Sequence, residues 1–182
     1  MANIIIIVIV LLLVLFIISI YNSLIAKRNR VKNAWAQIDV QLKKRFDLVP
    51  NLVETVKGYA RHEAGTLEAI VKARNQYISA GTPHEMMKAN TEMTGALSRL
   101  FALAESYPDL KANTNFKELQ NELSELEEKI AYARQFYNDT VMIYNNAIQM
   151  VPSNIVANLT GFREEPYFKA EEAERENVKV QF

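Results

Sequence analysis

The first residues to test for chemistry are two His-Glu dipeptides, at residues 62–63 and 84–85, because zinc metalloproteases open their metal motif with this pair. That motif places a second histidine one helical turn after the first, so that both imidazoles bind the same ion. The positions that would hold the second histidine are Thr66 and Lys88. Neither dipeptide therefore predicts a zinc site.

The composition excludes most other kinds of site. The chain has no cysteine and two histidines, so thiolate nucleophiles and cysteine metal sites are ruled out and general bases of ordinary pKa are scarce. It contains no glycine-rich phosphate loop and no G-x-S-x-G elbow. Basic and acidic residues are equal in number, 21 of each, which argues against a nucleic-acid-binding protein. We therefore expect no cofactor, no metal and no enzymatic activity. An enzyme with an unfamiliar carboxylate site is the least favoured alternative.

A repeated Tyr-Asn pair is the most unusual polar feature of the chain. Tyr137-Asn138 and Tyr144-Asn145 are one heptad apart, so both pairs lie on the same edge of a helix, and Arg134 lies one turn before Asn138. The favoured interpretation is a network of hydrogen bonds across the bundle that sets its register. The alternative is a surface that binds a ligand or a partner. Polar residues interrupt other apolar stretches in the same way: Asp39, Gln41, Arg45, Asn51, Arg74 and Glu105.

The elements that carry these residues follow helical periodicity. Between residues 35 and 70 the apolar positions recur at steps of three and four, which is typical of a helix that packs along one seam. Pro50 interrupts the hydrogen bonding of this stretch but not its phase. Two geometries remain open: one long helix that kinks at Pro50, or a tight turn after which Pro50 is the first residue of a new helix.

Further helices are expected towards the carboxyl terminus. Residues 80–83 form the clearest break, with a glycine that ends one helix and a proline that starts the next. Apolar seams then cover residues 87–107 and 116–151, and the second of these is the strongest. Apart from a brief alternation at residues 178–182, no pattern supports a sheet. The fold class is therefore all-α, an antiparallel up-and-down helical bundle, with four helices if the chain turns at Pro50 and three if it only kinks.

An apolar run begins at Ile4 and ends at Ile20, and no charged side chain precedes Lys27. At a rise of about 1.5 Å per residue the run spans about 25 Å, so it predicts a transmembrane helix. A cleaved signal peptide is the competing interpretation, but no basic residue precedes the run and no small-x-small cleavage site follows it soon. We expect a retained single-pass anchor in the cell membrane.

Charge predicts the orientation of this anchor. Its short amino-terminal side carries no charged side chain, whereas basic residues crowd the other side, so the amino terminus should lie outside and the bundle in the cytoplasm. The basic cluster has two open interpretations, contact with anionic lipid headgroups or a stop-transfer flank only. Its members are Lys27, Arg28, Arg30 and Lys32.

The chain divides into three expected segments. They are a transmembrane anchor at residues 1–22, a cytoplasmic helical bundle at residues 23–162 and an acidic tail at residues 163–182. The tail is rich in glutamate and lacks helical phase for most of its length. Two outcomes stay open for the tail: no order at all, or order that comes only from docking.

Long strings of this sequence resemble the bacterial LemA family. They cover nearly the whole chain in order: Tyr21-Asn22 and residues 28–63, 104–123, 133–145 and 151–162. The resemblance implies an amino-terminal segment outside, one membrane helix and a cytoplasmic bundle of four helices, which favours the turn at Pro50. It implies no enzyme activity. Family members often occur beside membrane zinc proteases of the HtpX type, and a relative takes part in magnetosome formation, so it also implies membrane organisation or quality control.

The function expected first is that of an interaction or scaffold protein, tethered to the lipid bilayer, that binds another membrane protein such as a membrane protease. The second is direct membrane binding or remodelling, in which the basic amphipathic stretch at residues 27–45 lies on the inner leaflet. A homo-oligomer is compatible with either function.

Overall fold

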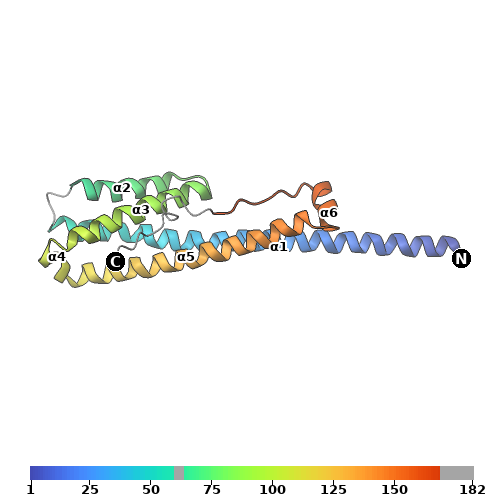
Figure 1. The fold of residues 1–182 in the computed structure, drawn as a ribbon, viewed down its shortest axis with the longest axis horizontal. Coiled ribbons are helices and arrows are strands. Elements are labelled where there is room, and N and C mark those ends of the chain that lie inside the picture. The colour runs from blue at the N-terminus through green and yellow to red at the C-terminus, as the bar shows by residue number, and fades with distance from the viewer. Residues whose placement is uncertain (60–63, 169–182) are drawn as a thin grey trace, which may run out of the picture. The chain divides into compact units, whose positions relative to one another are not determined.

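The computed structural model describes residues 1–59 and 64–168 of the chain. All regular structure in these residues is helical, which confirms the all-α fold class (Figure 1). The chain forms two compact units: one comprises Met1–Ala34 with Arg134–Phe182, described as far as Phe168, and the other comprises Trp35–Ala133. The helices are α1 (Ala2–Lys57), α2 (Ala64–Ser79), α3 (Pro83–Ala104), α4 (Pro108–Ala112), α5 (Thr114–Gln149) and α6 (Ser153–Thr160). The dipeptide at residues 62–63 and the tail at residues 169–182 lie outside the described residues.

Helix α1 passes through Pro50 without a turn, so the turn that the family resemblance favoured is wrong. The count of three helices expected without a turn is also wrong, because α1 ends at Lys57 and a separate helix, α2, begins at Ala64. A proline inside a helix removes one backbone hydrogen bond and costs about 3 kcal/mol or more. Here the apolar seam continues in phase across it, because Val49 and Val53 on either side are both buried while Pro50 itself is exposed. Burial of each such side chain contributes about 1.5 to 3 kcal/mol, so the packing offsets the local penalty.

In the unit Trp35–Ala133, α2 and α3 run alongside the carboxyl-terminal part of α1 and the first half of α5 (Figure 1). The Phe46 ring of α1 stacks on the Tyr77 ring of α2, with centroids 4.1 Å apart. The predicted seams supply the core of this unit, which includes Ile38, Leu42, Phe46, Ile70, Met93, Leu97, Leu100, Phe116, Leu123 and Ile130.

The predicted break at residues 80–83 is present, and it explains one of the His-Glu dipeptides. Thr82 caps the amino terminus of α3, and its Oγ1 accepts a hydrogen bond from Glu85 N at 3.3 Å. The Glu85 carboxylate in turn accepts from Gly81 N at 2.9 Å and from Thr82 N at 3.0 Å. Glu85 thus completes a capping box, and its role in the fold is to start α3.

In the other unit, α1 begins with apolar side chains that are exposed in the described part of the chain. Every large apolar residue from Ile4 to Ile18 is exposed. Among the described residues, α1 is the one helix long and apolar enough to cross a membrane by length and composition. Burial in the protein begins just after this run, at Leu24 and Val31.

Helix α6 follows α5 and leads into an extended segment. Gly161 ends α6 in the left-handed conformation, with φ of 75°, and Phe162 N donates to Ala157 O at 3.0 Å. The Phe162 ring then lies against Tyr21 of α1, with centroids 5.8 Å apart, and 5.0 Å beneath the Arg28 guanidinium. This contact directs residues 163–168 back along α5 (Figure 1).

Candidate functional site

The two Tyr-Asn pairs, which we call the Tyr-Asn ladder (Tyr137, Asn138, Tyr144 and Asn145), lie on one edge of α5. Seven residues make almost two helical turns, so the second pair stands above the first. Both tyrosines and Asn145 are buried, and Asn138 is half-buried. Burial of this kind requires hydrogen-bond partners for the amides and hydroxyls.

The partners of the asparagines are backbone groups of the chain's own segment 163–168. Asn145 Nδ2 donates to Glu165 O at 2.9 Å, and Glu165 N donates to Asn145 Oδ1 at 3.0 Å. Asn138 repeats the arrangement with Phe168, with both bonds at 2.9 Å. Each carboxamide therefore pairs with one residue of an extended chain as a neighbouring β-strand would.

The tyrosines complete the ladder through their hydroxyls. Tyr144 Oη donates to Arg163 O at 2.8 Å, and Tyr137 Oη donates to Pro166 O at 3.2 Å. Burial raises the pKa of both hydroxyls, and the charge of Glu165 raises it further; for Tyr144 the positive charge of Arg28 acts in the opposite direction. Both phenols thus keep their protons and remain hydrogen-bond donors.

The spacing of the ladder matches an extended chain. Asn138 and Asn145 are about 10.5 Å apart along α5, at a rise of 1.5 Å per residue. Glu165 and Phe168 are three residues apart, which is about 10 Å in an extended strand. Side chains seven residues apart on α5 therefore bind residues three apart in the segment. The segment runs antiparallel to α5.

Side chains of the segment contribute two further contacts. The Phe168 ring packs on the Tyr137 ring, with centroids 4.7 Å apart, and Gln149 Nε2 donates to Glu164 Oε1 at 2.7 Å. Arg134 lies half-buried on α5, one turn before Asn138. The chemistry of the site is recognition of a polypeptide backbone, together with one aromatic contact.

The structure separates the members of the basic cluster. Lys27 Nζ donates to Ser23 Oγ at 2.7 Å, and the Arg28 guanidinium lies over Phe162, so both act partly within the fold. Arg30 and Lys32 are exposed. The apolar face of the stretch at residues 27–45 is buried within the protein, which leaves Arg30 and Lys32 as the members most open to headgroups.

An ion pair between a buried arginine and a partly exposed glutamate in the unit Trp35–Ala133 had only a weak signal in the sequence. Arg45 of α1 is 2% exposed and forms a salt bridge with Glu127 of α5. Its guanidinium also donates to Asn90 Oδ1 at 2.5 Å and to Thr94 Oγ1 at 3.1 Å. Burial lowers the pKa of Arg45, and the charge of Glu127 opposes that shift. The contacts of Arg45 join α1 to α3 and α5, so the network fixes the register of these three helices.

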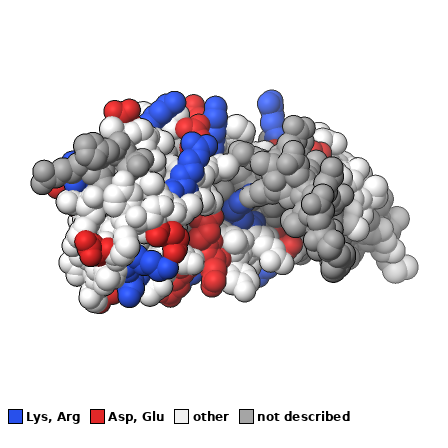
Figure 2. Space-filling model, turned by 60° about the vertical axis from the view of Figure 1, so that its left-hand side comes forward, with Lys and Arg blue, Asp and Glu red and all other residues white. Residues whose placement is uncertain are grey.

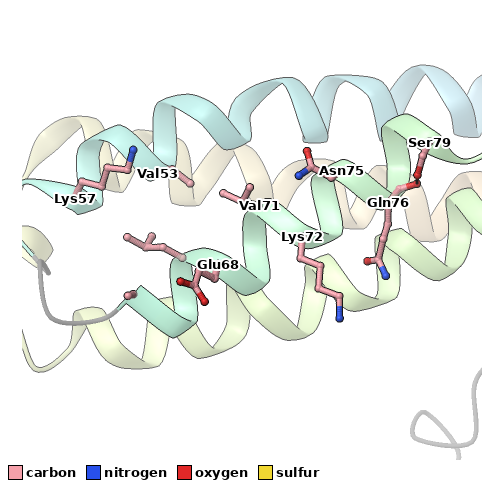
Figure 3. Close-up of a pocket in the computed structure, with 10 residues that line it drawn as sticks. Val53, Lys57, Glu68, Val71, Lys72, Asn75, Gln76 and Ser79 are labelled. Atoms are coloured by element: carbon pink, nitrogen blue, oxygen red, sulfur yellow. Dashed lines mark hydrogen bonds between the residues drawn. The ribbon is translucent and has the colours of Figure 1, made fainter.

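The same unit has a groove of about 940 Å³ between α1 and α2 (Figure 3). Val53 of α1 and Val71 of α2 approach each other across it, and Lys57 and Glu68 lie at the same end. On the face drawn in Figure 2, cationic and acidic side chains are intermixed. The groove is lined by apolar side chains together with charged and amide side chains such as Lys57, Glu68 and Gln76, whereas the Tyr-Asn ladder has a defined occupant.

A family model matches residues 34–182 of the chain, which includes the ladder and the segment it holds. The chain belongs to the LemA family. This confirms the resemblance read from the sequence.

The chain is also similar to curated relatives, although the sequence identities are low. The chain is 28% identical to protein LemA of Metamycoplasma hominis over 161 residues, which cover 86% of this chain and 72% of that one. It is 25% identical to the magnetosome protein MamQ 2 of Paramagnetospirillum magneticum over 179 residues, covering 84% and 66%. The magnetosome protein MamQ of Magnetospirillum gryphiswaldense is also 25% identical, covering 81% and 64%. The chain spans slightly less than two thirds of the length of these magnetosome relatives.

In this LemA-family chain, sequence patterns indicated the ladder residues on α5, but they did not indicate that residues 163–168 bind there. The heptad repeat of Tyr-Asn was visible, whereas segment 163–168 makes its contacts through backbone atoms. Apart from the N–H that proline lacks, backbone groups are the same in every residue, so the side of the site that residues 163–168 supply had no signal of its own beyond an aromatic residue at Phe168.

Proposed function

We propose that this LemA-type chain is a membrane-anchored interaction protein, without catalysis of its own, whose Tyr-Asn ladder binds extended polypeptide segments. The single observation that carries the proposal is the double hydrogen bond that each ladder asparagine makes with one residue of segment 163–168. When an extended peptide is bound by strand addition, main-chain hydrogen bonds supply the affinity, and each ladder asparagine offers the same donor and acceptor groups to the segment.

The chain's own segment then acts as the resident ligand. Any extended segment with N–H groups three residues apart, and an aromatic residue at the position of Phe168, presents the same groups to the ladder. The proposed partner is another membrane protein that offers such a segment in the cytoplasm and displaces residues 163–168. A membrane protease is one candidate, from the family resemblance, and the magnetosome relatives are compatible with a role in assembly at membranes.

Location and orientation are part of the proposal. The exposed apolar run from Ile4 to Ile18 supports anchoring in a bilayer. The cations Arg30 and Lys32 that follow it, both exposed, favour a cytoplasmic bundle. In this orientation the ladder faces the compartment where cytoplasmic segments of neighbouring membrane proteins are available.

A labelled peptide with the sequence of residues 161–168 tests the proposal. The full-length chain is purified with Glu165→Pro and Phe168→Pro, which removes the two N–H groups that the ladder accepts and so loosens the resident segment. We expect this variant to bind the peptide, measured by fluorescence anisotropy. Binding should be lost when Asn138→Ala and Asn145→Ala are added.

Backbone methylation provides the matched control. A peptide N-methylated at Glu165 and Phe168 lacks the two donors and should not bind. A peptide N-methylated at Glu164 and Tyr167 should bind normally, because among the described residues these two N–H groups donate to nothing. Equal binding of both peptides, or binding that survives loss of both asparagines, would contradict the proposal.

A further inference from the structure

Helix α6 packs one face against the protein, and its other face is exposed. Val156 and Ala157 are 6% and 1% exposed, whereas Ile155 and Leu159 are 57% and 82% exposed. The residues just before the helix add Met150 and Val151, which are also exposed. Four large apolar side chains within ten residues, on or just before one short helix, are thus exposed to solvent in the protein.

This apolar patch (Met150, Val151, Ile155 and Leu159) lies next to the end of the anchor. Phe162, two residues after α6, packs against Tyr21, and Tyr21 follows Ile20, the last residue of the apolar run. Figure 1 shows α6 beside α1 at this level. If residues 4–20 span a bilayer, α6 is positioned where the chain leaves it.

The charge distribution fits the same location. No charged side chain occurs from residue 150 to residue 162, although about a quarter of the chain (23%) is charged. The stretch combines the exposed apolar residues with Ser153, Asn154, Asn158 and Thr160. Because it carries no charge, this stretch can approach the acyl chains without the cost of moving an ionised side chain out of water.

We propose that α6 is a second membrane contact, whose apolar patch inserts into the bilayer interface beside the anchor. The inference rests on the membrane anchoring in the proposed function but not on the peptide-binding role of the ladder. Lipid is the occupant we favour because the patch continues an apolar surface, the anchor, that already requires it.

Single-cysteine variants can measure the depth of each residue, because the natural chain contains no cysteine. Nitroxide labels are placed at Ile155→Cys and Leu159→Cys in the full-length chain, reconstituted in vesicles of phosphatidylcholine and phosphatidylglycerol. Leu12→Cys reports on the anchor. Phe136→Cys is the matched control, since Phe136 is also an exposed apolar residue (50%) but lies about 20 Å before the end of α5.

Collision rates with oxygen, which partitions into lipid, and with a water-soluble nickel chelate separate the outcomes. We expect labels at residues 155 and 159 to favour oxygen, as the label at residue 12 does, and the label at residue 136 to favour nickel. Nickel collisions at residues 155 and 159 as frequent as at residue 136, with residue 12 still in lipid, would overturn the second contact and leave the anchor intact. Shielding of residues 155 and 159 from both reagents would mean that protein covers the patch, and would also overturn it. A label at residue 12 that favours nickel would overturn the anchor as well.

Discussion

Asn145 and Glu165 exchange two hydrogen bonds in the manner of paired peptide units, at 2.9 Å from Asn145 Nδ2 to Glu165 O and at 3.0 Å from Glu165 N to Asn145 Oδ1. The asparagine is 4% exposed, so its carboxamide depends on this partner. The geometry connects a feature that the sequence shows plainly, the heptad repeat of Tyr-Asn, with one that it does not, the path of the tail.

Replacement of Asn145 should release the tail. Asn145→Ala removes both bonds to Glu165, and we expect the local opening of this segment to become easier by about 1 to 3 kcal/mol. Hydrogen exchange at the amides of residues 163–168 measures the change. The matched control is Asn146→Ala, since Asn146 is the exposed neighbour on the same helix, and its loss should matter by less than about 0.5 kcal/mol. Equal exchange in the two variants would contradict the role assigned to Asn145.

Loss of Glu127 should destabilise the unit Trp35–Ala133. Glu127→Ala leaves the Arg45 guanidinium, whose side chain is 3% exposed, without its counter-charge. Removing one partner of a buried pair typically costs 3 to 5 kcal/mol, and we expect about 3 kcal/mol here because the Glu127 side chain is 40% exposed. Chemical unfolding of the full chain in micelles gives the value. Glu125→Ala is the control: its ion pair with Lys129 is exposed on both sides, so its loss should leave the stability nearly unchanged.

Acid should weaken the start of α3 through Glu85. Hydrogen bonds from Gly81 N and Thr82 hold the pKa of the Glu85 carboxyl below its usual value of 4.5. A lowered folded-state pKa contributes stability that is complete above the unfolded-state pKa and is lost as the pH falls through the folded-state pKa. We expect the difference in stability between the natural chain and Glu85→Gln to be constant near neutral pH and to shrink below about pH 4.5. A difference that does not change with pH would show that the carboxylate charge plays no part in the cap.

Topology can be checked with protease. If the amino terminus lies outside, protease added to intact cells should leave the bundle whole, and protease added to inverted vesicles should digest it. Digestion in intact cells would reverse the orientation. Leu12→Arg places a charge in the middle of the apolar run and should impair insertion by about 2.5 to 3.5 kcal/mol, which provides a control for the anchor itself.

Helix phase was the most predictable part of the fold. The 3-4 spacing located residues such as Ile38, Leu42 and Leu123 in the core, and the glycine and proline at residues 80–83 located a real break. Pro50 was harder, because local chemistry and packing disagree there: the proline argues for a boundary, and the buried residues on both sides argue for one helix. Only the packed structure shows that the second effect is larger.

The candidate site was predictable on one side only. Side-chain types mark Tyr144 and Asn145 as unusual on a helix, but their partners in residues 163–168 are mainly N–H and C=O groups. The sequence therefore favoured a cross-helix network over a partner surface, and the hydrogen bonds of the asparagines run to the chain's own residues 165 and 168. Arg45 was similarly visible as a polar interruption, whereas Glu127, on the exposed side of its helix pattern, was not.

Because the ladder holds Glu165 and Phe168 by their peptide groups, most of segment 163–168 is free to change in evolution. Exchanges of one side chain for another at Glu164 or Glu165 leave the paired N–H and C=O groups in place. The segment can therefore drift between relatives while the Tyr-Asn pairs stay, so tails of dissimilar sequence can share one docking mode. Proline at residue 165 or 168 is the change that would break the docking, since proline alone lacks the backbone N–H that donates to the asparagine.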